Sequence, residues 1–118
     1  MQDERRRGRL PWPVTMNSMY RSIKGRNILS RRAREYKKIC TIILGEPPSS
    51  PYPGEIGMIL LMHPPKNFRY DVDNYFKMIL DCLRGYWYSD DSQIQVLMGV
   101  KRLKDPAKEG FVNILIER

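Results

Sequence analysis

The sequence has very little of the residues that build disulfide scaffolds and zinc sites. Its 118 residues include only two cysteines, Cys40 and Cys82, and one histidine, His63. These numbers exclude a disulfide scaffold and a zinc site built from cysteine and histidine, so we expect both cysteines to be small core residues. Any metal must therefore be held by carboxylates, which favours a hard ion such as Mg²⁺ or Mn²⁺.

Long apolar runs are also missing. The longest one, Ile56 to Met62, is interrupted by Gly57 and is far shorter than the ~20 residues that cross a bilayer. The chain opens on charged residues rather than on an apolar stretch, which predicts no secretory signal. We therefore expect a cytoplasmic protein with no membrane partner, and a chain of this length predicts a single domain.

Positive charge is what the sequence has in excess. Twenty-one Lys and Arg against thirteen Asp and Glu give a net charge of +8. The excess is concentrated in residues 21–38, which hold eight basic residues and one acid. Such a patch attracts polyanions, and nucleic acid is the leading candidate, although a solvated basic helix face has the same composition. The candidate DNA contacts in this stretch are Arg21, Lys24, Arg26, Arg31, Arg32 and Arg34.

Acidic residues are clustered as well, in a chain that is otherwise basic. Five of the seven aspartates lie between Asp71 and Asp91. Asp71 and Asp73 stand two residues apart where a loop is expected to enter a helix, and in an extended segment such side chains point the same way. Lys77 follows Asp73 by one helical turn, and Asp91 begins a later strand that could bring a third carboxylate back.

These residue types suit one kind of chemistry. Carboxylates with open positions suit Mg²⁺, which would polarise a phosphate and activate a water, while Lys77 would stabilise the charge that develops. Each residue also has a plain structural interpretation. Asp73 could be a helix cap, Asp73 and Lys77 a surface ion pair, and Asp90 with Asp91 a turn. Asp81 is assigned to the solvent-facing side of its helix.

Hydrophobic periodicity predicts an α+β fold in which two helices pack on a small mixed sheet. Ser30 is expected to cap a first helix that ends at Gly45, with Ala33, Tyr36, Cys40, Ile43 and Leu44 on its apolar face. A second helix is expected to follow Asp73 and to end at Gly85. The predicted strands cover residues 55–63, which are expected to be mostly buried, and residues 94–100 and 112–116, whose alternating apolar residues are typical of half-buried strands.

The N-terminal part is expected to be less regular. Residues 1–9 are interpreted as a basic arm that runs into a short strand near Arg9, and residues 10–118 as the folded domain. Val14 to Tyr20 is expected to be a loop, and residues 25–27 a turn.

Taken together, these residues resemble the RusA family of Holliday-junction resolvases, which are commonly carried by phages and prophages. The signature is D-x-D-N-x-x-K at Asp71–Lys77, followed by D-D-x-Q-[IV] at Asp90–Ile94. Further matching segments make the resemblance cover nearly the whole chain. They are Leu10-Pro11-Trp12-Pro13, Asn17, Tyr20, Gly25-Arg26, Asp81-Cys82-Leu83 and the basic helix after Ser30.

The resemblance implies a homodimeric endonuclease with a RusA-like fold that nicks four-way DNA junctions symmetrically, in a bacterial or phage-infected bacterial cell. It implies Mg²⁺ as cofactor, with Mn²⁺ able to substitute, and no small-molecule cofactor. Asp71, Asp73 and Asp91 would bind the metal, Lys77 would be the catalytic lysine, and Asp90 would support them. The family often carries a basic run just before the first aspartate. Here that run is thin, and Arg69 is its candidate DNA contact.

Two other functions remain open at this stage. One is a nuclease of the same family that cuts flaps or forks as readily as four-way junctions. The other is a basic DNA- or RNA-binding protein without catalysis, in which the aspartates are only structural.

Overall fold

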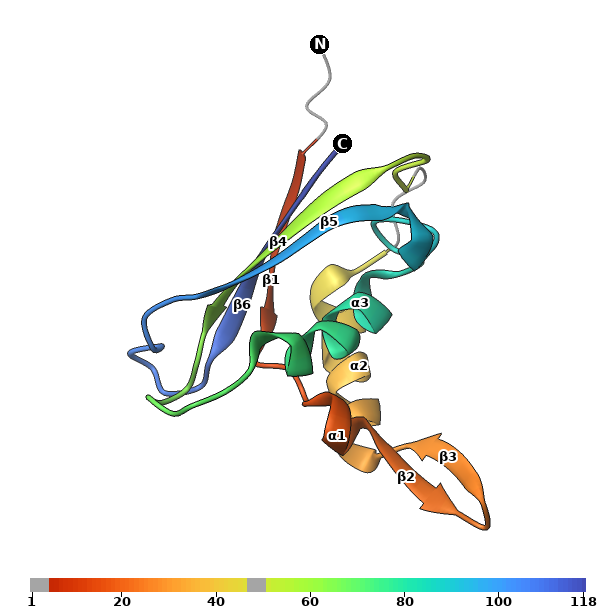
Figure 1. Ribbon diagram of the computed structural model, residues 1–118, viewed down its shortest axis with the longest axis vertical. Coiled ribbons are helices and arrows are strands. Elements are labelled where there is room, and N and C mark those ends of the chain that lie inside the picture. Colours follow the sequence, from red (N-terminus) through yellow and green to blue (C-terminus); the bar gives the residue numbers. More distant parts are fainter. Residues whose placement is uncertain (1–4, 47–50) are drawn as a thin grey trace.

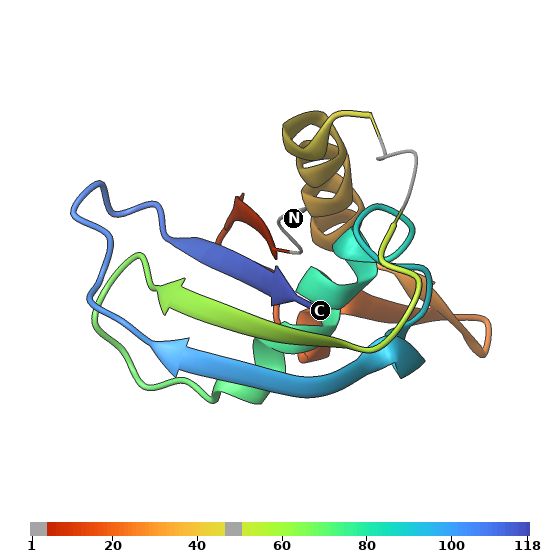
Figure 2. The same ribbon diagram turned by 90° about the horizontal axis from the view of Figure 1, so that it is seen from above.

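A four-stranded mixed sheet is the centre of the protein (Figure 1). The computed structural model describes residues 5–46 and 51–118. The strands lie in the order β1 (Arg5–Pro11), β6 (Phe111–Glu117), β4 (Ile56–His63) and β5 (Ile94–Lys101), as Figure 2 shows from above. β4 and β5 are parallel, and the other two pairs are antiparallel. The helices cover one face of this sheet, which confirms the predicted α+β fold.

β1 is longer than the sequence suggested. It begins at Arg5 and pairs with β6 from Arg5↔Glu117 to Pro11↔Phe111. Residues 5–9, which were assigned to a separate arm, are therefore part of the sheet, and residues 1–4 of that arm lie outside the described residues. Its run of arginines hides this strand from a search for apolar periodicity, because its stability comes from its hydrogen-bonded partner rather than from its own apolar face.

α2 (Arg31–Leu44) packs on the sheet as predicted. Ser30 caps it, since its Oγ accepts from the Ala33 N–H at 3.2 Å, and Gly45 ends it with φ 71°. Tyr36 and Cys40 are buried with Ala33, and the Tyr36 hydroxyl donates to the Pro11 carbonyl at 2.6 Å, which ties the helix to β1. The expectation for Ile43 is wrong: it is 50% exposed, because the described residues leave the last turn of α2 open on that side.

The second predicted helix has two parts. A 3₁₀ turn, η1 (Val72–Tyr75), leads into α3 (Phe76–Leu83), whose buried residues are Met78, Ile79, Cys82 and Leu83. A second 3₁₀ turn, η2 (Asp91–Gln93), precedes β5. No helix among the described residues has both the length and the apolar character that a membrane span requires.

The stretch between β1 and α2 differs from the expected loop and turn. It forms a short helix, α1 (Met16–Met19), and a hairpin of β2 (Tyr20–Ile23) and β3 (Arg26–Leu29). The two turn residues, Lys24 and Gly25, both have positive φ, as the two-residue turns of hairpins require. The strands are only four residues long and almost fully exposed, so they carry no apolar alternation that the sequence could reveal.

The two faces of the sheet are covered unequally. In β4 the side chains of Ile56, Met58, Leu60 and Met62 are buried beneath the helices. The alternating residues of β5 were expected to point into that core, but Val96 and Met98 are 57% and 49% exposed. Register places them beside Gly57 and Ile59 on the other face, which no helix of residues 5–46 or 51–118 covers.

Candidate active site

The first two predicted ligands lie at the start of the second helical segment. Asp71 is extended (φ −95°, ψ 126°) and directly precedes η1, whereas Asp73 lies inside that 3₁₀ turn. The assumption that both residues are extended therefore fails at Asp73, and Asp73 does not cap α3, whose first residue follows Tyr75 without a side-chain cap. Both carboxylates are exposed, and neither makes a hydrogen bond or ion pair with a side chain of residues 5–46 or 51–118.

An aromatic cluster supports the chain just before Asp71. The Trp12 ring lies 5.3 Å from that of Tyr70 and 4.9 Å from that of Tyr75, and Phe68 packs against Tyr70 at 5.1 Å. The Tyr70 hydroxyl is buried without a hydrogen-bond partner among the described residues, and burial raises the pKa of this phenol. Rings on both sides of Asp71 thus hold the entry to η1 in a fixed position.

Lys77 lies on the first turn of α3, where it contacts Asp81 rather than the expected Asp73. Its Nζ is 3.5 Å from Asp81 and 5.9 Å from the centre of the Tyr20 ring at the base of the hairpin. Partial burial lowers the pKa of Lys77, but the attraction of Asp81 and the contacts with Tyr20 outweigh burial and raise that pKa overall. Lys77 therefore remains an ammonium ion at neutral pH.

Asp81 is not the solvent-facing residue that the sequence suggested. Its side chain is only 8% exposed, since Lys77 and Arg84 lie over its two oxygens. The Arg84 guanidinium is 3.3 Å from Asp81 and 2.8 Å from Asp91, so it links the end of α3 to η2. Burial alone lowers the pKa of Arg84, and the two carboxylates raise it further than burial lowers it.

Asp91 is held on both oxygens. Oδ2 accepts from Arg84, and Oδ1 accepts from the Tyr88 hydroxyl at 3.0 Å. Burial, together with the charge of Asp91, raises the pKa of Tyr88, so its hydroxyl remains a donor. The sequence analysis missed Arg84 and Tyr88, although the i, i+3 spacing of Asp81 and Arg84 was a usable signal.

Asp90 and Gln93 shape the turn that presents Asp91. The Asp90 carboxylate accepts from the Ser92 N–H at 3.0 Å, and these bonds with Ser92 lower the pKa of Asp90. The Gln93 side chain accepts from the Ser89 and Asp90 N–H groups and donates to the carbonyls of Tyr52 and Gly54 at 2.6 and 2.8 Å. The D-D-x-Q spacing thus has a structural reason, because it closes η2 and ties it to the segment before β4.

The donor chemistry here fits a hard divalent ion, although three carboxylates do not meet. Within the described part of the chain, no three His, Cys, Asp or Glu side chains come together in a way that could hold a metal. Asp71 and Asp73 are free at one end of α3, whereas Asp91 is bound to Arg84 near the other end. Mg²⁺ commonly takes only one or two carboxylates besides water and substrate phosphate, so the free pair suits it.

The candidate DNA contacts form one exposed region beside Lys77. Arg21, Lys24 and Arg26 lie on the hairpin, and Arg31, Arg32 and Arg34 lie in the first turns of α2. Positive charges at a helix N-terminus oppose the helix dipole, so their place is not explained by stability. Two of them have partners, since Arg31 pairs with Glu35 at 3.0 Å and Arg34 donates to the Leu29 carbonyl. Arg69 is exposed separately, before Asp71.

Comparison with known proteins identifies the family. A family model described as endodeoxyribonuclease RusA matches residues 11–116. The chain belongs to the RusA family. A curated relative in this family, the crossover junction endodeoxyribonuclease RusA of Enterobacteria phage 82, is 32% identical over 88 residues, which are 72% of each chain. This RusA-family protein is therefore an endodeoxyribonuclease, a hydrolase that acts on DNA, and not a binding protein without catalysis.

Proposed function

We propose that this enzyme resolves four-way DNA junctions by paired symmetric nicks that depend on Mg²⁺, in the cytoplasm of a bacterial or phage-infected cell. The observation that carries the proposal is the state of Asp71 and Asp73. They are exposed and unpaired among the described residues, although the chain carries a net charge of +8 and offers many cations. Carboxylates placed for stability would pair with those cations, whereas metal ligands must stay available.

Each residue of the candidate active site has a separate role in this proposal. Asp71 and Asp73 would hold Mg²⁺, or Mn²⁺ in its place, and the ion would supply Lewis-acid activation and charge neutralisation at the phosphate. Asp91 would join them as a third ligand only by leaving Arg84, which binds it near the other end of α3. Lys77, kept charged and oriented by Asp81 and Tyr20, would stabilise negative charge that develops on the scissile phosphate. Arg84 and Tyr88 would set the position of Asp91, and Asp90 would set the turn before it.

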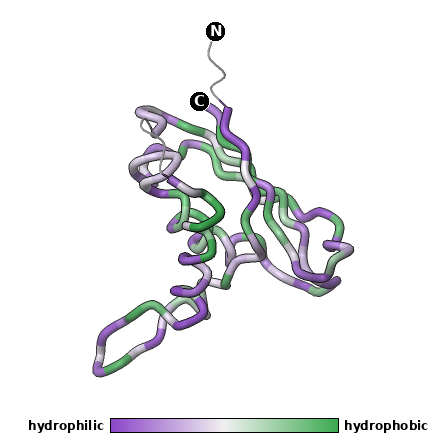
Figure 3. Tube along the Cα trace, turned by 180° about the vertical axis from the view of Figure 1, so that it is seen from behind, coloured by the Kyte–Doolittle hydropathy of each residue, from purple (hydrophilic) through white to green (hydrophobic). Residues whose placement is uncertain are grey.

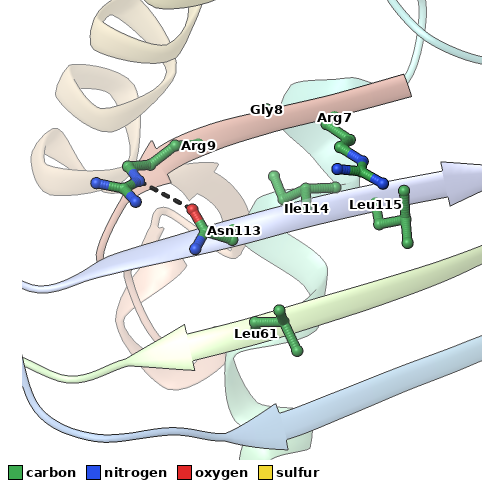
Figure 4. Close-up of a pocket in the computed structure, with 7 residues that line it drawn as sticks. All are labelled: Arg7, Gly8, Arg9, Leu61, Asn113, Ile114 and Leu115. Atoms are coloured by element: carbon green, nitrogen blue, oxygen red, sulfur yellow. Dashed lines mark hydrogen bonds between the residues drawn. The ribbon is translucent and has the colours of Figure 1, made fainter. Parts of the chain in front are cut away.

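The uncovered face of the sheet supports a homodimer. Ile59, Leu61 and Leu115 lie at its centre beside Val96 and Met98, and all are at least partly exposed. Figure 4 shows how Arg7 and Arg9 of β1 border a hollow on this face that Leu61 and Leu115 line. An apolar centre with a charged border is typical of subunit interfaces. A four-way junction has approximate two-fold symmetry, so two copies related by a two-fold axis would supply the two cuts.

The basic region would contact the DNA backbone. Its members are Arg21, Lys24, Arg26, Arg31, Arg32 and Arg34, with Arg69 on the other side of the candidate metal site. Recognition through phosphates is set by the shape of the branch rather than by base sequence. We therefore expect binding to weaken steeply as salt rises.

The deciding experiment is gel-resolved cleavage of a synthetic four-way junction. With Mg²⁺, the wild type is expected to give paired nicks, and EDTA is expected to abolish them. Asp73→Asn should keep junction binding and lose cleavage. The matched control is Glu109→Gln, which makes the same carboxylate-to-amide change at an exposed turn outside the site and should cut normally.

Two results would contradict the proposal. Cleavage by Asp73→Asn at the wild-type rate would remove the metal site from the mechanism. Equal cleavage rates on junction, fork and flap substrates would instead favour the second candidate, a nuclease of broad specificity for branched DNA.

A further inference from the structure

The hairpin of β2 and β3 extends away from the rest of the protein. Figures 1 and 3 show it as a two-stranded ribbon beyond α1 and the start of α2. Every residue from Tyr20 to Ile28 is exposed, and Leu29 is half-buried. A two-stranded hairpin gains little stability by itself, and this one buries almost nothing. A binding role therefore accounts for it better than a role in folding.

The register of the hairpin gives its two faces different chemistry. The pairs Arg21↔Ile28 and Ile23↔Arg26 place two isoleucines and two arginines on one face. Each isoleucine thus stands directly across from an arginine. Ile23 is 40% exposed and Ile28 is 36% exposed, so both offer apolar surface between positive charges.

Exposed isoleucines beside positive charges fit a nucleic acid partner better than they fit a second copy of this chain. Residues 20–29 include Arg21, Lys24 and Arg26 and no acid. A second copy of the hairpin would bring like charges together, which opposes association. DNA satisfies both features, since its phosphates attract arginine and lysine, and apolar side chains such as isoleucine insert between unstacked base pairs.

The base of the hairpin touches the candidate active site. The ring of Tyr20, the first residue of β2, has its centre 5.9 Å from the Lys77 Nζ. Ile23 is three residues further along the strand, which corresponds to about 10 Å at a rise of roughly 3.3 Å per residue. That distance spans about three nucleotides of one DNA strand. The apolar face therefore lies close enough to the scissile phosphate to act on the branch point.

We propose that Ile23 and Ile28 form a wedge that packs against bases unstacked at the branch point, while Arg21 and Arg26 bind the flanking phosphates. Four-way junctions interrupt base stacking where the strands exchange, so the cost of inserting an apolar residue is lower there than in continuous duplex. The wedge would thus give the enzyme its preference for branched DNA. This inference rests on the proposed function and adds to it the residues that discriminate branch from duplex.

The test uses a junction with 2-aminopurine at the branch point, bound in EDTA so that it is not cut. Wild-type protein is expected to raise the fluorescence, because the base leaves the stack. The double variant Ile23→Ala with Ile28→Ala should lose the fluorescence increase and about tenfold in junction affinity, with duplex affinity unchanged. Ile42→Ala is the matched control, since Ile42 is 80% exposed on α2 and should behave as wild type.

The arginines provide a second, distinguishable comparison. Arg21→Ala with Arg26→Ala should weaken binding to junction and duplex alike and lower the slope of log K against log salt by about 2. If the isoleucine variant keeps both the fluorescence increase and the junction preference, the wedge is wrong while the proposed function stands. If that variant instead changes the molecular mass in solution, the hairpin is a contact between copies and the wedge is wrong. If the wild type itself shows no junction preference, both proposals fail together.

Discussion

Lys77 is fixed both in position and in charge. Asp81 lies on one side of it and Tyr20 on the other, and together they raise its pKa. A lysine in this state cannot act as a general base near neutral pH, because it has no free lone pair. Its available contribution is a positive charge held one helical turn after Asp73.

Removing that charge should affect cleavage more than binding. We expect Lys77→Met to bind a four-way junction with nearly wild-type affinity and to cut it about 10²-fold more slowly in single-turnover assays. Lys104→Met removes a lysine from an exposed loop and serves as control. Equal loss of affinity and rate would indicate that Lys77 only binds the backbone.

Asp105 offers a prediction about stability. Its carboxylate accepts from the N–H groups of Ala107 at 2.9 Å, Gly110 at 2.9 Å and Glu109 at 3.3 Å. These bonds lower the pKa of Asp105 below its usual value of 3.8. Since the pKa is lower in the folded than in the unfolded state, the carboxylate stabilises the fold above pH 3.8 and loses this effect as the pH falls.

Asp105→Asn should therefore melt at a lower temperature than wild type at pH 7, and the difference should shrink as the pH falls below 3.8. Thermal unfolding followed by circular dichroism at several pH values measures this. Glu109→Gln is a suitable control, because the Glu109 side chain holds no backbone N–H in this turn. A difference that stays constant with pH would show that ionisation of Asp105 is not the cause.

At this scale the sequence could identify candidate residues but not their contacts. The spacing that placed Lys77 beside Asp73 applies equally to Asp81, four residues on. Asp73 lies in a 3₁₀ turn with three residues per turn, so its direction differs from that of the α-helix that begins at Phe76. Arg84 and Tyr88 could not be assigned to Asp91 from sequence, because η2 returns to α3 only in the folded chain.

Among the elements, η1 depends most on a single small residue. A Cβ built on Gly99 of β5 would lie 2.6 Å from the Val72 side chain and 2.7 Å from the Phe76 ring. Only glycine lets the start of the second helical segment lie this close to the sheet. The position of Asp71 and Asp73 therefore depends on the absence of a side chain at Gly99 in the neighbouring strand.

Gly99→Ala should push η1 away from β5. We expect a loss of about 1–3 kcal/mol in the free energy of unfolding, measured with urea, together with reduced junction cleavage. Gly54→Ala provides the control, since no atom of the described residues beyond its chain neighbours lies within 4 Å of the added methyl group. If Gly99→Ala keeps wild-type stability and cleavage, the close approach at Gly99 does not determine the position of η1.

Elements with a buried apolar face were predictable, and the others were not. Ser30, Gly45 and the apolar residues of α2 and α3 defined two helices because burial and capping leave a pattern in the sequence. β1 begins with three consecutive arginines, and the hairpin strands bury almost nothing, so neither has such a pattern. In β5 the alternation was recognised. The sequence does not show which face of the sheet the helices cover, so Val96 and Met98 were assigned to the wrong face.

For the whole molecule, the uncovered sheet face is the main feature without a partner. Met98→Glu places a charge at its centre, where Met98 is 49% exposed. If two copies pair through this face, light scattering should show the mass falling to that of one chain, and paired nicking should be lost. Ile42→Glu adds the same charge on α2 outside the face and should remain dimeric. A monomeric wild type, or a dimeric Met98→Glu, would contradict this assignment of the interface.

The strand order also determines when the chain can fold during synthesis. β6, the last strand, lies between β1 and β4, so the first strand and the rest of the sheet are joined only through residues 111–117. Residues 111–117 must therefore be synthesised before the sheet can close, and such non-local pairing folds slowly. Until then, β1 and β4 have no strand between them. The nuclease would thus gain its activity only once β6 has left the ribosome and paired with both neighbouring strands.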